Sequence, residues 1–318
     1  MASTQAYDQA ASDMRRPSKQ PDGNLDAREL IRYATLAASS HNTQPWKFRV
    51  RKNQITILPD FSRRCPVVDP DDSHLFKSLG CAAENLVHAA AAQGFSAEVQ
   101  FDSAENAINV FLKSDATAHE TDFYRAITKR QCVKTAYDGK PISAMELEKL
   151  ERAGQGSFVR TIMLSSETQK NAVIDYVTRG NIAQLHDRGF RDELVAWIRF
   201  NPAAAMHQGD GLAGRTSGNP ALPTWLAKLI FGLVLTPKGQ AATDATNIRS
   251  SAGFAIFVSR HNDKSAWVEV GRAYERFALQ ATALNIRTAF INQPIEVLPL
   301  RAEFESWLKL DSEHALLM

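Results

Sequence analysis

Apolar side chains recur along most of the chain at spacings that alternate between those of helices and those of strands. The clearest helix lies between Ser73 and Gln93, where apolar residues step by three or four positions. Ser265 to Leu284 shows the same period, with Trp267, Val270, Tyr274, Phe277, Ala281 and Leu284 on the expected buried face. Further helices are predicted to begin at Asp26, Thr121, Ser143, about Thr168 and about Leu298, and the one at Thr168 is expected to run to Phe200.

Short segments with strand character separate these helices. The predicted strands are Lys47–Arg51, Gln54–Leu58, Ala97–Phe101, Ala107–Leu112, Arg160–Leu164, Phe254–Ser259 and Arg287–Ile291. Helices interleaved with antiparallel strands in this way indicate an α+β fold, with mixed or antiparallel sheets packed against helices.

Two segments lack this regularity. Residues 1–24 are polar, contain almost no large apolar side chain and are predicted to form a disordered tail. Residues 201–250 are punctuated by Gly and Pro around one short apolar stretch, Trp225–Leu235. Such an insertion is typical of a lid, a binding loop or a subunit contact.

The composition narrows the class of protein. The 318 residues correspond to about two domain-sized units, and 37 basic against 35 acidic residues leave a net charge of +2. This balance argues against a nucleic-acid partner, which would favour a basic excess on one face. Cys65, Cys81 and Cys132 are too few and too widely spaced for a disulfide framework, and the longest apolar run is too short to span a membrane. We therefore expect a soluble cytoplasmic protein.

Several chemical motifs are absent or lack their structural context. Gly209, Gly211 and Gly214 have the spacing of a dinucleotide-binding turn, but no strand precedes them, so a flexible loop is the better interpretation. The sequence contains no nucleophile elbow, no Walker loop and no zinc-binding histidine pair. Hydrolase chemistry and a metal site are therefore not expected.

The densest polar cluster, Ser39–Trp46, lies between the end of a predicted helix and the start of a predicted strand. It is compatible with a solvated turn that satisfies the helix end. Its hydroxyl and amide groups are equally able to bond the edge of a planar heterocycle.

A second candidate is the segment Arg130–Tyr137, in which Arg130 and Lys134 stand four residues apart. Two such cations ordinarily form a solvated basic face. Alternatively, Arg130 binds a phosphate and Lys134 supplies a charge elsewhere on the same ligand. The spacing does not decide between the two.

Both segments resemble motifs of the FMN-dependent nitroreductase family. Ser39–Trp46 is similar to its S-S-x-N-x-Q-P-W loop, and the segment beginning at Arg130 is similar to its phosphate-binding R-x-S-x-K-x-[FY]. Asn292–Glu296 resembles its P-I-E turn beside the flavin N5. The resemblance extends over roughly residues 25–310 and implies a nitroreductase-like fold.

The order of the motifs resembles that of the fused branch of the family, which includes dormancy-associated mycobacterial nitroreductase-like proteins. In ordinary members the basic segment precedes the loop, and the flavin lies at a dimer interface; here the loop comes first. The resemblance implies that two half-units in one chain mimic a dimer around one flavin. The halves would be residues 25–115 and 116–318, with the lid insertion at about 201–250 in the second. Either a monomeric pseudo-dimer or a homodimer fits this arrangement.

The family motifs assign roles to individual positions. Arg130, with Gln131 and Cys132, would hold the FMN phosphate, and Lys134 would lie near N1 and the C2 carbonyl. From the first half, the residues expected to contact the ring are Ser39, Ser40, Asn42 and Gln44. Pro294, Ile295 and Glu296 would face N5. Substrate contacts are expected from His41, Gln208, Asn219 and Trp225.

The implied activity is transfer of hydride from NAD(P)H through FMN to a small planar acceptor such as a nitroaromatic or a quinone. No catalytic side chain is expected, because the chemistry takes place at the flavin N5. Cys132 replaces the hydroxyl of the family motif, and the chain ends at Met318 where the family often continues to a basic residue. These departures imply a weaker phosphate site or a truncated chain. The alternatives are a protein that sequesters flavin under a closed lid and a flavin-free interaction protein.

Overall fold

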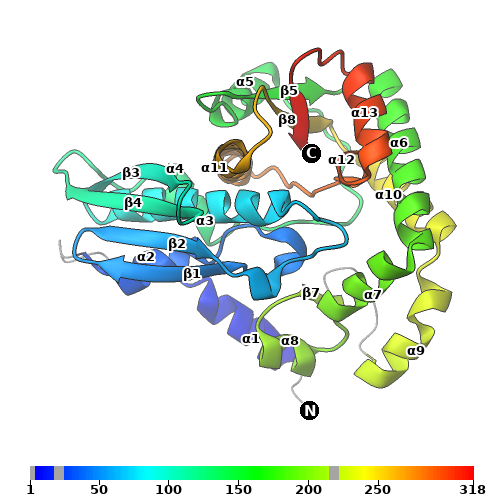
Figure 1. The fold of residues 1–318 in the computed structure, drawn as a ribbon, viewed down its shortest axis with the longest axis horizontal. Helices are drawn as coiled ribbons and strands as arrows, with labels where there is room; N and C mark the ends of the chain where they lie inside the picture. The colour runs from blue at the N-terminus through cyan, green and yellow to red at the C-terminus, as the bar shows by residue number, and fades with distance from the viewer. Residues whose placement is uncertain (1–3, 18–24, 215–221) are drawn as a thin grey trace.

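The structure is a computed structural model that describes residues 4–17, 25–214 and 222–318. Two antiparallel sheets lie in different halves of the chain, and helices pack between and around them (Figure 1). The first sheet has the order β1 (Trp46–Arg51), β2 (Gln54–Pro59), β4 (Ala107–Ser114), β3 (Phe95–Asp102). The second has the order β5 (Val159–Leu164), β8 (Phe254–Ser259), β9 (His314–Leu317). The predicted α+β class is confirmed.

The predicted helix starts correspond to capped helices in the structure. Asp26 accepts hydrogen bonds from the first turn of α2 (Ala27–Ala34), and Thr121 caps α4 (Asp122–Ile127). Ser143 and Glu146 form a complete capping box at the start of α5 (Ala144–Ala153). Because these caps satisfy amide groups that have no partner inside the helix, short helices begin at defined residues.

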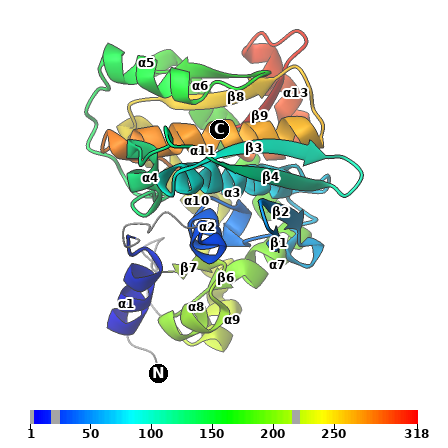
Figure 2. The same ribbon diagram turned by 90° about the vertical axis from the view of Figure 1, so that its left-hand side faces the viewer.

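Helices α3 (Ser73–Ala92) and α11 (Lys264–Ala283) cross between the two sheets, as Figure 2 shows for α11 below β8 and β9. The crossing is unusually close at two glycines. A Cβ atom on Gly80 would lie 2.1 Å from the carbonyl oxygen of Val268, and one on Gly271 would lie 1.9 Å from that of Lys77. Side chains from both halves join in one hydrophobic core around this crossing. The halves are therefore packed together through backbone contact.

A second, smaller core lies on the other side of the second sheet. It is covered by α6 (Glu167–His186), α10 (Pro237–Ser250) and α13 (Leu298–Trp307), with the short α12 (Gln293–Glu296) at its edge. Phe304 and Ile295 are fully buried in this core. It positions the turn that resembles the P-I-E motif.

The structure corrects two expectations about individual elements. The long helix predicted from Thr168 to Phe200 is two helices, α6 and α7 (Arg188–Trp197), because Asp187 is extended and its carboxylate caps the second helix. Residues 287–291 are not a strand, and only Thr288 pairs, in a bridge to Cys132. The edge of the second sheet, next to β8, is instead occupied by β9, the last strand of the chain.

Residues 201–250 are more regular than their Gly and Pro content predicts. They contain α8 (Pro202–Gln208), β7 (Leu212–Ala213), α9 (Thr224–Val234) and α10, and β7 pairs in parallel with β6 (Ile198–Arg199). Ala245 and Ile248 of α10 are buried, so this helix is part of the second core. Among the described residues of this segment, Gly209 and Gly211 form hydrogen bonds with the loop at residues 39–46.

The expected disordered tail also differs from the structure, in which residues Thr4–Met14 form the helix α1. None of its side chains is buried. It is held at its end, where Arg15 donates hydrogen bonds to the carbonyl oxygens of Thr128 and Arg130, and Arg32 donates one to that of Met14.

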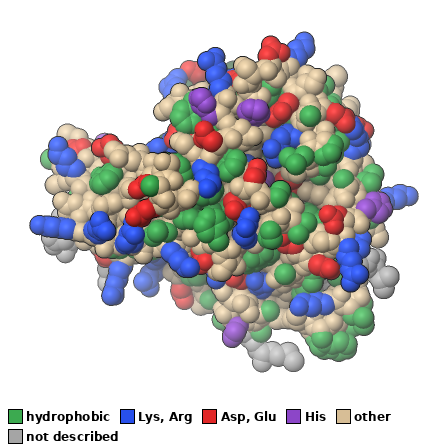
Figure 3. All heavy atoms as spheres, in the orientation of Figure 1, with side chains coloured by type: hydrophobic (Ala, Val, Ile, Leu, Met, Phe, Trp, Pro, Cys, Tyr) green, Lys and Arg blue, Asp and Glu red, His purple; other side chains and the backbone are tan. Residues whose placement is uncertain are grey.

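Charged side chains of both signs are interspersed over the face shown in Figure 3. This distribution agrees with the near-zero net charge. None of the helices in the described ranges is both long enough and apolar enough to cross a bilayer. The described residues also contain no group of three His, Cys, Asp or Glu side chains suited to holding a metal ion.

Candidate functional site

A cavity of about 230 Å³ lies at the boundary between the two halves of the chain. One wall comes from the loop before α3 and the first turn of that helix, and the other from α12 and α13. The lining residues are Val68, Asp69, Pro70, Asp71, Ser73, His74, Glu296, Leu298 and Arg301. Glu296 is the one predicted site residue among them.

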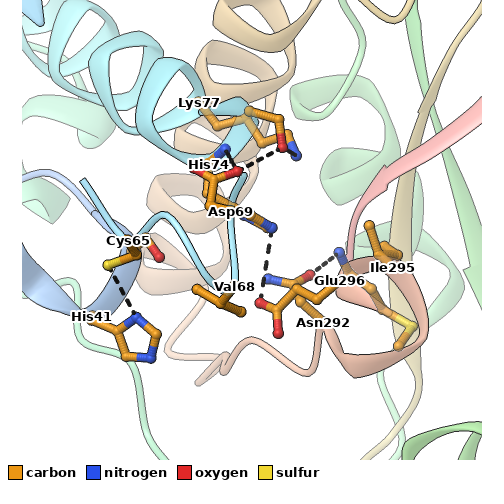
Figure 4. Close-up of polar contacts among 12 residues, drawn as sticks. His41, Cys65, Val68, Asp69, His74, Lys77, Asn292, Ile295 and Glu296 are labelled. Atoms are coloured by element: carbon orange, nitrogen blue, oxygen red, sulfur yellow. Dashed lines mark hydrogen bonds and ion pairs between the residues drawn. The ribbon is translucent and has the colours of Figure 1, made fainter. Parts of the chain in front are cut away.

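Asp69 positions the first wall, because its side chain caps the N-terminus of α3 although it precedes the first helical residue by four positions. Its Oδ1 accepts hydrogen bonds from the backbone N–H of His74 at 3.0 Å and from the hydroxyl of Ser73 at 3.1 Å (Figure 4). Its Oδ2 accepts one from the N–H of Leu75 at 3.0 Å. Asp72, which directly precedes the helix, has a left-handed backbone with φ 64° and makes no capping bond. The position of Asp69 at the N-terminus of α3 also suits a carboxylate, because the helix dipole favours negative charge there.

Two basic side chains of α3 are buried behind this cap. His74 Nε2 lies 3.8 Å from Glu296 Oε1, and the Lys77 ammonium lies 3.3 Å from the Ser73 hydroxyl. Burial, helped by the charge of Lys77, holds the pKa of His74 well below its usual value, so its imidazole is neutral at pH 7. Burial lowers the pKa of Lys77 to about 8 and raises that of Glu296.

His41 lies in the loop that resembles the flavin-binding motif, in a short 3-10 turn at Ser40–Asn42. His41, Asn42 and Gln44 all have left-handed backbones, with φ of 46°, 53° and 51°. Residues other than glycine rarely adopt this backbone conformation, and such strain is concentrated at functional sites. His41 Nδ1 is 3.7 Å from the buried thiol of Cys65 (Figure 4).

The charges around His41 connect the loop to the second half of the chain. Burial and, to a smaller extent, the positive charge of Lys134 lower the pKa of His41 to about 4, whereas Asp69 opposes this shift. Lys134 also acts on Glu296, where it counteracts the rise in pKa that burial causes. The charge of Lys134 therefore acts on two other predicted residues, His41 and Glu296.

The other polar residues of the loop are engaged inside the protein. The Asn42 amide donates to the carbonyl of Gly211 at 3.0 Å, and the Gln44 amide donates to that of Gly209 at 2.6 Å. The Gly211 N–H in turn donates to the Asn42 carbonyl. Ser39 accepts a bond from the Gln44 N–H, and the Ser40 N–H donates to Ser78 of α3. Asn42 and Gln44 therefore hold residues 209–211 against the loop.

The ion pairs of Asp210 with Arg63 and Arg199, together called the Asp210 latch, strengthen this contact. The buried carboxylate of Asp210 accepts hydrogen bonds from Arg63 at 2.8 Å and from Arg199 at 2.7 Å, and Arg63 also donates to the carbonyl of Thr43. Hydrogen bonds between a guanidinium group and a carboxylate are stronger than those between neutral groups. Residues 198–214 are thus fixed on the loop by charge as well as by backbone contact.

Replacing Asp210 by Asn should loosen this latch. The change removes the charge that balances Arg63 and Arg199, at an expected cost of about 1–2 kcal/mol. Hydrogen exchange at the Gly211 amide should therefore accelerate about tenfold. The matched control is Asp138→Asn, because the ion pair of Asp138 with Lys140 is exposed. Equal exchange at Gly211 in the wild type and in Asp210→Asn would contradict the latch.

Arg130 has a different environment from the one its motif implies. Its Nε lies 3.2 Å from Glu275 Oε1 of α11, and its Nη2 donates to the carbonyl of Leu36 at 3.1 Å. Arg130 is buried and Glu275 is completely so, and burial raises the pKa of Glu275 although Arg130 opposes the shift. In this arrangement the charge of Arg130 is balanced within the protein and is not presented to a phosphate.

The remaining predicted residues are distributed as follows. Gln131 and Cys132 are exposed, and Pro294 and Ile295 are buried in α12. The N–H groups of Ile295 and Glu296 both donate to the carbonyl of Asn292, so neither is free to face a ligand. Gln208 is exposed at the end of α8, whereas Asn219 lies outside the described residues. Trp225 is 71% exposed and is not among the residues that line the cavity.

The sequence patterns do not indicate four polar residues that the structure places in or near these contacts, namely Asp69, His74, Lys77 and Glu275. Each carries a charge or a polar ring within a segment whose neighbours are buried. The pattern gives no signal for Lys77 or Glu275, since both lie outside the apolar face that the period predicts for their helices. For Asp69 no such signal exists, because the cap acts across four to six residues.

Comparison with known proteins supports a relationship over most of the chain. No family model matches it. Two curated proteins of Mycobacterium tuberculosis are each 25% identical to it over 299 residues, which cover 88% of this chain and 80% of theirs. They are named "Putative NAD(P)H nitroreductase MT3217", from strain CDC 1551 / Oshkosh, and "Putative NAD(P)H nitroreductase Rv3131", from strain ATCC 25618 / H37Rv. The resemblance to nitroreductases and the nitroreductase-like fold are thereby confirmed.

Proposed function

We propose that this relative of the nitroreductases is an FMN-dependent oxidoreductase that takes hydride from NAD(P)H and reduces a small planar acceptor such as a nitroaromatic or a quinone. The observation that carries the proposal is that the charge of Lys134, from the second half, acts both on His41 of the first half and on Glu296 of the second. These residues come from three motifs that are far apart in the sequence. The names of both relatives agree with NAD(P)H as the reductant and with reduction of a nitro compound.

The two halves would act as a fused pseudo-dimer that holds one flavin. The close crossing of α3 and α11 at Gly80 and Gly271, within a core shared by both halves, supports this arrangement. The cavity at the boundary receives walls from both halves. One chain would therefore supply both sides of the site.

The predicted site residues fit the ring of FMN better than its phosphate. Lys134 is an exposed cation whose charge acts on Glu296, and such a cation suits an edge where negative charge gathers in the reduced flavin. Arg130 does not fit a phosphate while it pairs with Glu275. When bound, FMN would supply N5 as the hydride acceptor, and the neutral imidazole of His74 would give the cavity a polar wall without adding charge.

Flavin sequestration is the second candidate, and one specific observation favours it. Asn42, Gln44 and the Asp210 latch hold residues 198–214 firmly against the loop that would contact the ring. A closed segment at this position would restrict the entry of reductant and acceptor. The two candidates share the cofactor and differ in turnover.

The visible spectrum of the purified protein, followed by anaerobic mixing with NADPH and with NADH, separates these functions. The proposal predicts a bound flavin that bleaches rapidly and recovers when a quinone or nitroaromatic is added. A bound flavin that neither nucleotide bleaches would support sequestration. A protein that stays colourless when FMN is added would instead indicate a flavin-free interaction protein and would overturn both.

Lys134→Met tests the predicted ring-edge contact. Loss of a charge-assisted hydrogen bond should weaken FMN binding about tenfold and lower the flavin reduction potential, because the reduced form loses a nearby cation. Both quantities can be followed by flavin fluorescence and by a redox titration. Lys140→Met is the control, since Lys140 is 81% exposed and pairs only with exposed Asp138 among the described contacts. An unchanged potential in Lys134→Met would remove Lys134 from the site.

A further inference from the structure

Helix α9 has an apolar face that the rest of the described protein does not cover. Trp225 and Leu229 stand one helical turn apart and are 71% and 73% exposed. Lys228, between them, is also exposed. The helix lies at the lower right of Figure 1, where Figure 3 shows hydrophobic side chains gathered at the surface. Large apolar side chains exposed together in this way mark an interaction surface.

The opposite side of α9 attaches the helix to the protein. Ala227 is buried, and the ring of Phe231 packs edge-on against Phe200 with 6.0 Å between centroids. Because this side is packed, the exposure of Trp225 and Leu229 does not result from a detached helix. The exposed face is a stable feature of the described fold.

The charged residues in the stretch of sequence that contains α9 have one sign only. Between Asp210 and Asp244 the sequence contains Arg215, Lys228 and Lys238 and neither Asp nor Glu. Lys228 and Lys238 are both exposed. An apolar face with Trp, bordered by lysines, is typical of helices that lie in the headgroup region of an anionic lipid surface. Its 11 residues are too few to cross a bilayer.

We propose that α9 docks the protein on an anionic lipid surface. Trp225 and Leu229 enter the boundary between headgroups and acyl chains, and Lys228 and Lys238 interact with the negative headgroups. A second copy of the chain is a poorer occupant. A twofold contact would bring the same lysines of both copies together without any acidic residue from this stretch to balance them.

Co-sedimentation with vesicles tests the proposal. The full chain should bind vesicles of phosphatidylcholine with phosphatidylglycerol, and it should bind pure phosphatidylcholine vesicles much less. The double variant Lys228→Gln/Lys238→Gln should weaken binding about fivefold per lysine, and added salt should do the same. Trp225→Gln/Leu229→Gln should abolish binding to both kinds of vesicle.

Met145→Gln provides the matched control, because Met145 is 64% exposed on α5, away from this surface. Far-UV circular dichroism and thermal unfolding should be the same for all variants, since the altered side chains are exposed. Absence of binding to anionic vesicles would overturn the proposal. So would concentration-dependent dimerisation of the wild type that Trp225→Gln/Leu229→Gln removes, because a second copy would then cover the face.

Discussion

Arg130→Ala is expected to lower the free energy of unfolding by about 4 kcal/mol, because it leaves Glu275 as an uncompensated buried charge. Glu275 is completely buried, and its one ion-pair partner among the described residues is Arg130. Chemical denaturation monitored by circular dichroism measures this loss. Arg152→Ala is the control, since the ion pair of Arg152 with Glu148 is exposed and should contribute less than about 1 kcal/mol.

A double variant separates the structural role of Arg130 from a role in phosphate binding. Arg130→Met/Glu275→Leu removes both charges and should recover most of the lost stability, because an apolar pair of similar size avoids the cost of burying charge. If the pair is purely structural, this variant also retains FMN. A variant that folds stably but has lost FMN would show that Arg130 binds the phosphate, and that the pairing seen here changes when flavin binds.

Gly271→Ala is expected to lower the free energy of unfolding by about 3 kcal/mol, because there is no space for a Cβ atom at the crossing of α3 and α11. The nearest atoms are backbone atoms of Lys77, so no side chain can rotate away, and the two helices must separate. Since the crossing joins the two halves, the cavity at their boundary should widen and FMN binding should weaken as well.

Gly214→Ala provides the comparison for this change. A Cβ atom there meets its nearest atom at 3.5 Å, which is an ordinary contact, so its effect on stability should be small. Thermal unfolding of both variants, with FMN affinity measured in parallel, provides the test. Equal stability of Gly271→Ala and the wild type would show that the helices are not in backbone contact.

Much of the fold follows from local patterns in the sequence. The period of three and four residues predicted α3 and α11 almost to their ends, and the Ser143–Glu146 capping box marked the start of α5. These signals are local, since each depends on residues within one or two turns. The strand predicted at residues 287–291 was wrong, because a strand-like run of residues does not show whether a partner strand exists. The edge of the second sheet, beside β8, is occupied by β9 instead.

The candidate site was predictable only where a motif is contiguous. His41, Lys134 and Glu296 each lie in such a motif, and the charge of Lys134 acts on the other two. The pairing of Arg130 with Glu275 joins residues 145 positions apart, and the bonds of Asn42 and Gln44 to Gly211 and Gly209 join the loop to a distant segment. Contacts of this kind depend on the packing of the halves and leave no periodic trace in the sequence.

The most direct measurement of the proposed site is the number of flavins per chain in the monomeric species. Size-exclusion chromatography with light scattering identifies that species, and its absorbance at visible and ultraviolet wavelengths gives the ratio of FMN to protein. If one chain supplies both sides of the site, the monomer should hold one FMN. Flavin found only in a dimer, or a monomer that binds none when FMN is in excess, would contradict a complete site within a single chain.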